Sequence, residues 1–175
     1  MRAGGVLRAI GLLAIGSVAA IGCRASEANP GSGLTPPAGW QAQPALAAAA
    51  TEAAKSDGVT VEASEAWADP ARGCYAAWIA WTGAAGAPEK LADALVLAVS
   101  SEKSLEGIAV RDVAKPTPGA NAGVVSLAFE RAPYRGTVRA QLTRDGHVAA
   151  LACYWNQREP AACEAACSKL VGSMR

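Results

Sequence analysis

The chain has 175 residues and a formal net charge of +1 at pH 7. This length favours one domain and is too short for two comfortable ones. A charge so close to zero argues against binding through bulk electrostatics to a nucleic acid, so we expect no nucleic-acid partner.

The N-terminus carries a short charged region followed by an apolar run that ends at a cysteine. Arg2 and Arg8 come first, fourteen uncharged residues follow at 9–22, and Cys23 is next. This is the layout of an export signal. A helix of that length would cover only about 21 Å of a hydrocarbon core of roughly 30 Å, so we expect a cleaved signal rather than a membrane span.

The sequence Ala19-Ala20-Ile21-Gly22-Cys23 resembles the lipobox of bacterial lipoprotein precursors, although Ala20 stands where that family most often has Leu. The resemblance implies that residues 1–22 are a signal peptide and that the thiol of Cys23 receives a diacylglyceryl group. After cleavage, Cys23 would be the acylated first residue, with fatty acids such as palmitate holding the protein in the cell envelope. Arg24, in place of Asp, implies the outer membrane. The alternative is an ordinary secretory signal with a chance cysteine near the cut.

The mature chain then divides into a tether and one folded domain. Residues 23–39 are expected to be a lipid-anchored flexible tether, because they are rich in Gly, Pro and Ser and lack apolar periodicity. Residues 40–175 are expected to form the domain. Its first helix is predicted from Pro44 to about Ser56, with Gly58 as the stop signal.

Alternating patterns predict an antiparallel sheet. The runs Val59–Trp67 and Cys74–Thr82 should form a hairpin, and bulky side chains on both faces of the second run favour a central strand. Further elements are predicted as follows: a helix from about Pro88 with Leu91, Leu95 and Val99 on one stripe, a strand at Ile108–Val113, a loop at Ala114–Gly123, and a strand at Val124–Glu130.

A second hairpin is predicted near the C-terminus. The strand Gly136–Arg144 leads into Asp145-Gly146, the favoured pair for a two-residue turn. That turn would place Val138 opposite Cys153, with the cysteine pointing inward. It would also place Arg139 beside Tyr154.

A closing helix is predicted from Pro160, with Cys163 and Cys167 on its buried stripe. Together with Cys74 and Cys153 they give an even number of cysteines in an exported chain, so we expect two disulfides. A bond between the two helix cysteines would be strained, because Cβ atoms four apart are about 5–6 Å apart. We therefore expect two links from helix to sheet and favour Cys153–Cys163 with Cys74–Cys167.

Few residues are candidates for chemistry. The spacing of Cys163 and Cys167 matches neither a redox pair nor a zinc site, so we expect no metal and no cofactor. His147 would be the natural general base of a small hydrolase. It directly follows the predicted turn, however, and no Gly-x-Ser-x-Gly motif occurs, so we expect no catalytic residue.

Arg139 and Tyr154 form a candidate binding face, in which a cation–π platform could receive a ligand carboxylate or an acidic protein. The charge distribution leaves two possibilities open. Residues 40–110 hold nine acidic and four basic side chains, whereas residues 111–175 hold nine basic and five acidic ones. If one sheet interleaves the two halves, the charges cancel; if the bases share a face, an acidic partner fits.

The order of elements, with its Gly-Thr-Val-Arg…Arg-Asp-Gly-His hairpin, is similar to that of the PsbP/Mog1/DcrB-like lipoproteins. That resemblance implies an α/β/α sandwich with binding or assembly roles, and it assigns no site residues. The sequence therefore predicts a single-domain, disulfide-stapled α+β protein with a non-catalytic binding or scaffolding role. Its partners would be the membrane, through the lipid, and another envelope protein or a small ligand. The alternatives are an envelope hydrolase using His147 and an exported thiol protein.

Overall fold

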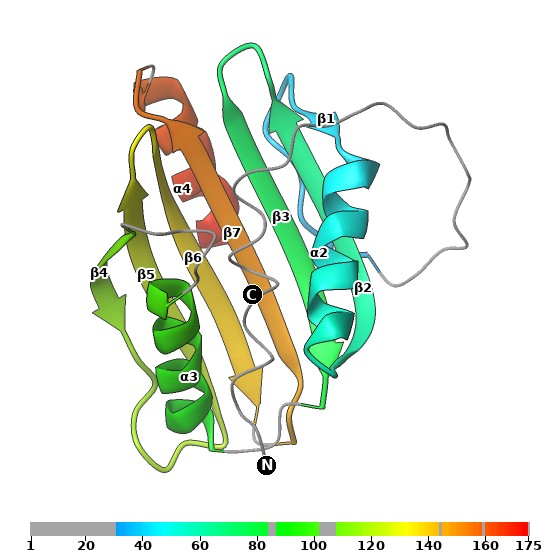
Figure 1. Ribbon diagram of the computed structural model, residues 1–175, viewed down its shortest axis with the longest axis vertical. Coiled ribbons are helices and arrows are strands. Elements are labelled where there is room, and N and C mark those ends of the chain that lie inside the picture. Colours follow the sequence, from blue (N-terminus) through cyan, green and yellow to red (C-terminus); the bar gives the residue numbers. More distant parts are fainter. Residues whose placement is uncertain (1–30, 84–86, 102–107, 144, 159, 175) are drawn as a thin grey trace.

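The computed structural model describes residues 31–83, 87–101, 108–143, 145–158 and 160–174 (Figure 1). The predicted signal peptide and Cys23 lie outside the described residues. In chain order, the strands and helices are β1 (Gln41–Ala42), α2 (Pro44–Ser56), β2 (Thr60–Asp69), β3 (Cys74–Thr82), α3 (Pro88–Ser101), β4 (Ala109–Ala114), β5 (Ala122–Arg131), β6 (Tyr134–Thr143), β7 (Val148–Asn156) and α4 (Pro160–Ser173).

The strands form one seven-stranded antiparallel sheet in the order β1-β2-β3-β7-β6-β5-β4. The chain thus has the predicted α+β class. Strand β3 is central, as the bulk on both of its faces predicts, and its pairing with β7 joins the first half of the chain to the second. The strands of the two halves do not alternate in the sheet. Strands β1–β3 of the acidic half lie at one side, and strands β4–β7, which carry most of the basic half, lie together at the other.

The helices contact both faces of the sheet. Helices α2 and α3 pack against one face, where buried alanines of α2 and Leu95 and Val99 of α3 meet Ile79 and Leu127. Helix α4 packs against the other face through Cys163, Cys167 and Leu170, and Figure 1 shows it behind β6 and β7. Short alanine side chains let α2 lie close to the sheet, but each buries little apolar area.

The register of the β6–β7 hairpin differs from the predicted one by a single residue. The backbone N–H of Thr143 donates to the carbonyl oxygen of His147 at 3.0 Å, which leaves three residues, 144–146, in the loop. Gly146 closes that loop with a φ of +88°, the conformation that glycine adopts without strain. Arg144 itself lies outside the described residues.

One residue more in the loop reverses which side chains share a face, because side chains alternate along a strand. Val138 pairs with Ala152, and Cys153 pairs with Thr137. Cys153 is buried, as predicted, but it faces α4 rather than the side of Val138. The predicted neighbours of Arg139 change in the same way.

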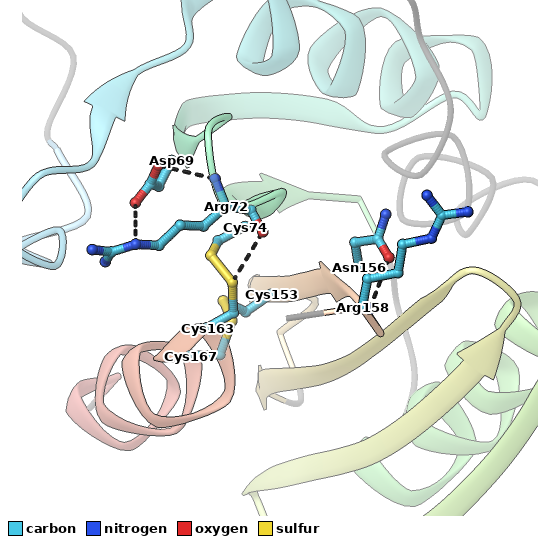
Figure 2. The surroundings of a disulfide bond; sticks show 8 residues. All are labelled: Asp69, Arg72, Cys74, Cys153, Asn156, Arg158, Cys163 and Cys167. Atoms are coloured by element: carbon cyan, nitrogen blue, oxygen red, sulfur yellow. Dashed lines mark hydrogen bonds and ion pairs between the residues drawn. A yellow bond between two sulfur atoms is a disulfide. The ribbon is translucent and has the colours of Figure 1, made fainter. Parts of the chain in front are cut away.

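Both disulfides join α4 to a strand (Figure 2). Cys163 is bonded to Cys74 at the start of β3, and Cys167 is bonded to Cys153 in β7; the Cα atoms of each pair are 5.6 Å apart. The prediction of two links from helix to sheet is confirmed.

The preferred pairing, Cys153–Cys163 with Cys74–Cys167, is wrong. Cys74 lies opposite Trp155, near the end of β7 from which the chain turns into α4. The first cysteine of the helix therefore meets Cys74, and the second meets Cys153 further along β7.

The packed part of the chain begins before Trp40, the boundary that the sequence predicts. Ser32 donates two hydrogen bonds to the carboxylate of Glu65 on β2, from its backbone N–H at 3.1 Å and from its hydroxyl at 2.5 Å. Leu34 packs beside Trp40 against the cluster around α4. Within residues 31–39, the described part of the predicted tether, Ser32 and Leu34 thus contact the folded domain.

The pairing of the cysteines leads to a first prediction. The Cys74–Cys163 bond spans 89 residues and the Cys153–Cys167 bond spans 14. In the chain-entropy model, loops of these lengths contribute about 4.6 and about 3 kcal/mol to stability. Replacing both members of the first pair by Ala should therefore lower the free energy of unfolding more than replacing both members of the second, as measured by urea denaturation. Non-reducing peptide mapping checks the pairing itself, and a Cys163–Cys167 peptide would contradict it.

Candidate binding site

Helix α4 covers only part of its face of the sheet. It packs mainly over β7 and the buried side chains of β3, contacts β6, and leaves the same face of β5 without a helix in the described chain. A groove of about 570 Å³ opens between α4 and these strands. Its strand side is polar, with Ser126 and Glu130 from β5 and Arg135, Thr137 and Arg139 from β6. This is the candidate binding site.

Glu130 holds two of the arginines that border the groove. Its carboxylate forms ion pairs with Arg135, its cross-strand neighbour, and with Arg111 of β4 at 3.0 Å. The arginine side chains of both pairs are largely exposed, so each pair contributes little to stability. The effect of the pairs is to fix both guanidinium groups at one end of the groove.

Arg139 differs from these two arginines. It makes no hydrogen bond or ion pair with any described residue, and its Nε is buried without a partner. Its cross-strand neighbours are Ser126 and Leu151, neither of which carries a negative charge. The indole N–H of Trp155, a groove residue only 4% exposed, is likewise buried without a partner. Buried polar groups are usually hydrogen-bonded, so two such groups beside one groove single it out.

The predicted pair of Arg139 and Tyr154 is not brought together. Tyr154 belongs to the core on the α2 and α3 face, whereas Arg139 lines the groove on the α4 face. The reason is the three-residue loop, which moves Tyr154 opposite Gly136 instead of beside Arg139. Of the two residues of the predicted binding face, only Arg139 lies in the groove.

A larger cavity, of about 850 Å³, lies at the other end of α4 beneath residues 32–38. Its apolar lining includes Trp78, Leu170 and Met174, all of which are buried. No side-chain atom of these lining residues is a buried polar group without a partner. The smaller groove is therefore the better candidate, because the unpartnered N–H groups of Arg139 and Trp155 favour a ligand that accepts hydrogen bonds.

His147 is exposed at the end of the β6–β7 hairpin. Its Nδ1 lies 3.5 Å from Glu62 and its Nε2 lies 3.9 Å from Asp145. A hydrogen bond from the Thr143 hydroxyl is the main cause that lowers the pKa of Asp145, so this carboxyl is ionised at neutral pH. Described contacts of the imidazole are thus with carboxylates and include no hydroxyl or thiol nucleophile.

The described residues contain no group of three or more His, Cys, Asp or Glu side chains placed to hold a metal ion. Likewise, no described helix is both long and apolar enough to cross a membrane. All four described cysteines are in disulfides.

Sequence reasoning missed Glu130, Arg111 and Trp155. The alternation of Ser126, Ala128 and Glu130 with the apolar residues of β5 was a usable signal for a polar sheet face. The position of Trp155 was not predictable in the same way, because it depends on the hairpin register.

Comparison with protein-family models and with curated proteins finds no match to this chain, so its function has to be inferred from the groove.

The opposite face of the sheet yields a prediction on alkaline stability. Tyr154 stacks on Tyr75 at 5.2 Å and meets the edge of Tyr134 at 6.1 Å. Burial, followed by the two neighbouring phenols, raises the pKa of Tyr154 well above 10. A raised pKa means that the folded state retains a proton that the unfolded chain releases, so stability is present below about pH 10 and falls as the pH rises further.

We expect the free energy of unfolding to decrease above pH 10, with Tyr154 contributing up to about 1.4 kcal/mol per pH unit. Tyr154→Phe should reduce this slope, as measured by urea titrations between pH 9 and about 11. Tyr134→Phe, for which burial is smaller, serves as the control. Equal slopes in the two variants and the parent protein would contradict the assignment.

Proposed function

We propose that this protein is a lipid-anchored binding protein of the cell envelope that acts without catalysis. The observation that carries the proposal is the groove beside α4, where Arg139 has no partner within the described chain. The N-terminal lipobox resemblance supports the anchor, with Cys23 as the lipidated residue and the outer membrane as its location. The two disulfides are consistent with an oxidising compartment.

The placement of the helices supports an α/β/α sandwich like that of the PsbP/Mog1/DcrB-like lipoproteins, in which α2 and α3 form one outer layer and α4 the other. In this arrangement the layer formed by α4 is incomplete. A sheet face that carries polar side chains and no covering helix suits a partner or ligand, whether another envelope protein or a small molecule.

The two alternative functions have less support. A hydrolase using His147 would need a nucleophile, and the described contacts of this side chain are with Glu62 and Asp145. An exported thiol protein would need a reduced cysteine, and Cys74, Cys153, Cys163 and Cys167 are bonded to one another.

The anchor gives one prediction. Cys23→Ser should abolish labelling of the protein by radioactive palmitate and leave uncut or soluble product, because the thioether that holds the diacylglyceryl group cannot form on a hydroxyl. Cys74→Ser should leave the labelling intact and is the control. Undiminished labelling of the Cys23→Ser protein would refute lipidation at this position.

The groove gives another. A photo-reactive amino acid at Ser168, which lines the groove from α4, should crosslink to a binding partner in the cells that make the protein. Arg139→Glu should weaken this crosslink while the melting temperature stays nearly unchanged, since the side chain makes no hydrogen bond or ion pair with a described residue that the change would break.

The same photo-reactive group at Lys55, on α2 at the opposite face, is the matched control and should give no crosslink that depends on Arg139. Equal capture at both positions, or capture at Ser168 that Arg139→Glu leaves unchanged, would count against the groove as the binding site. A large loss of stability in Arg139→Glu would instead identify the residue as structural.

A further inference from the structure

We propose that Arg139 is a carboxylate-binding residue, and that the groove takes a ligand with a single carboxylate group beside Ser126 and Arg139. The inference rests on the proposed binding function and specifies its chemistry. It follows from the balance of charge in the groove, from the hydrogen-bonding groups near Arg139 and from the size of the space.

The charge balance singles out one cation. Arg111 and Arg135 share the carboxylate of Glu130, so each has an acidic partner, and one of their two positive charges is offset. Arg139, four residues further along β6, has no such counterion among the residues that the structure describes. The residue is half-buried, and its Nε is buried without a described partner. A monoanion at this point would satisfy both the charge and the donors.

Two acidic residues border the groove as well. Asp112 is exposed on β4, and Glu164 is exposed near the start of α4. Glu164 lies two helical turns before Gly172, a distance of about 12 Å along the axis. The direction of α4, set by the order of its two disulfides, carries Gly172 toward Arg139 and leaves Glu164 at the end of Arg135. Both acids therefore disfavour a multiply charged anion in the groove, and Glu164 does so without occupying the place of a carboxylate at Arg139.

The donors around Arg139 match the shape of a carboxylate. A guanidinium group presents a planar fork that binds the two oxygens of a carboxylate together. Ser126, directly opposite on β5, makes no side-chain hydrogen bond with a described residue, so its hydroxyl is available to donate. Thr137, by contrast, donates to the carbonyl oxygen of Leu127 at 3.2 Å. Gly172 has open space where a side chain would be, which leaves room above the fork.

The size of the groove restricts the ligand. Its volume of about 570 Å³ lies within the range of about 300–1,000 Å³ that is typical of small-molecule sites. A carboxylate can come from a small acid or from an acidic side chain of a protein segment. Both sources present the same group to Arg139, and they differ in what fills the remainder of the groove.

The test uses the full-length mature protein with its disulfides intact. Succinate monomethyl ester represents a small monocarboxylate, and a capped hexapeptide with one glutamate among five uncharged residues represents an acidic protein segment. Binding is followed by NMR, through the Nε–Hε signal of Arg139 and the indole N–H signal of Trp155. Both signals should shift and saturate with at least one of the probes, and the probe with the tighter dissociation constant identifies the source of the carboxylate.

Matched variants separate Arg139 from the other arginines. Arg139→Gln should weaken probe binding at least tenfold, and Arg139→Lys should restore only part of it, because Lys keeps the charge and loses the fork. Arg72→Gln removes the same charge at a position outside the groove, where the guanidinium is paired with Asp69, so binding should change less than threefold. Unchanged melting temperatures establish that each variant is folded.

The outcomes distinguish this inference from the proposed function. Inorganic phosphate binding more tightly than either probe, or equal losses in Arg139→Gln and Arg72→Gln, would overturn the carboxylate assignment. Absence of probe binding would overturn it too, and a retained Arg139-dependent crosslink at Ser168 would then show that the groove still binds a partner of different chemistry. Conversely, probe binding without an Arg139-dependent crosslink at Ser168 would support the carboxylate site and count against a protein partner in the groove.

Discussion

The attachment of α4 to the sheet is the constraint on which the rest of this structure depends. Two disulfides, one helical turn apart, tie the helix to β3 and β7, the neighbouring strands that join the two halves of the chain. The rest of the helix surface is rich in alanine, and beside the cysteines Leu170 is the only described residue of the helix that is buried, with Met174 buried just after its end. A helix with so little apolar area gains little from the hydrophobic effect, so the covalent links fix a position that packing alone would hold weakly.

The second determinant is the length of one loop. With two residues between β6 and β7, Arg139 would share a face with Tyr154; with three, it shares a face with Leu151, Cys153 and Trp155. The same single residue turns Cys153 toward α4 and thereby permits its bond to Cys167. The position of the arginine and the pairing of the cysteines are thus consequences of one register. A shift of this register by one residue would move both Arg139 and Cys153 to the opposite face of the sheet relative to each other's present neighbours.

The helices and strands follow largely from the local sequence, but the face of the sheet on which each side chain lies does not. Pro44 and Pro160 begin helices as predicted, and the run Cys74–Thr82 is a strand with the predicted bounds, because these signals act on the neighbouring backbone. The pair Asp145-Gly146, in contrast, suits both a two-residue turn and the end of a three-residue loop. No local signal decides between them, and the choice reverses every face. The contact of Ser32 with Glu65 joins residues 33 apart, so a stretch with the composition of a tether gave no indication that it packs on the sheet.

An arginine without a partner is costly in a folded protein, because a buried donor that has lost water and gained nothing in exchange destabilises the native state. Arg139 could have been relieved if α4 had shifted sideways over β5 and β6, or if a neighbouring side chain had supplied an acceptor. The disulfides prevent the first, since Cys163 and Cys167 hold the helix above β3 and β7. The pairing of Glu130 with Arg111 and Arg135 prevents the second. The groove therefore remains open, and its arginine has no counterion among the described residues. Because the walls of such a site are already fixed before binding, little of the binding free energy is lost to ordering them.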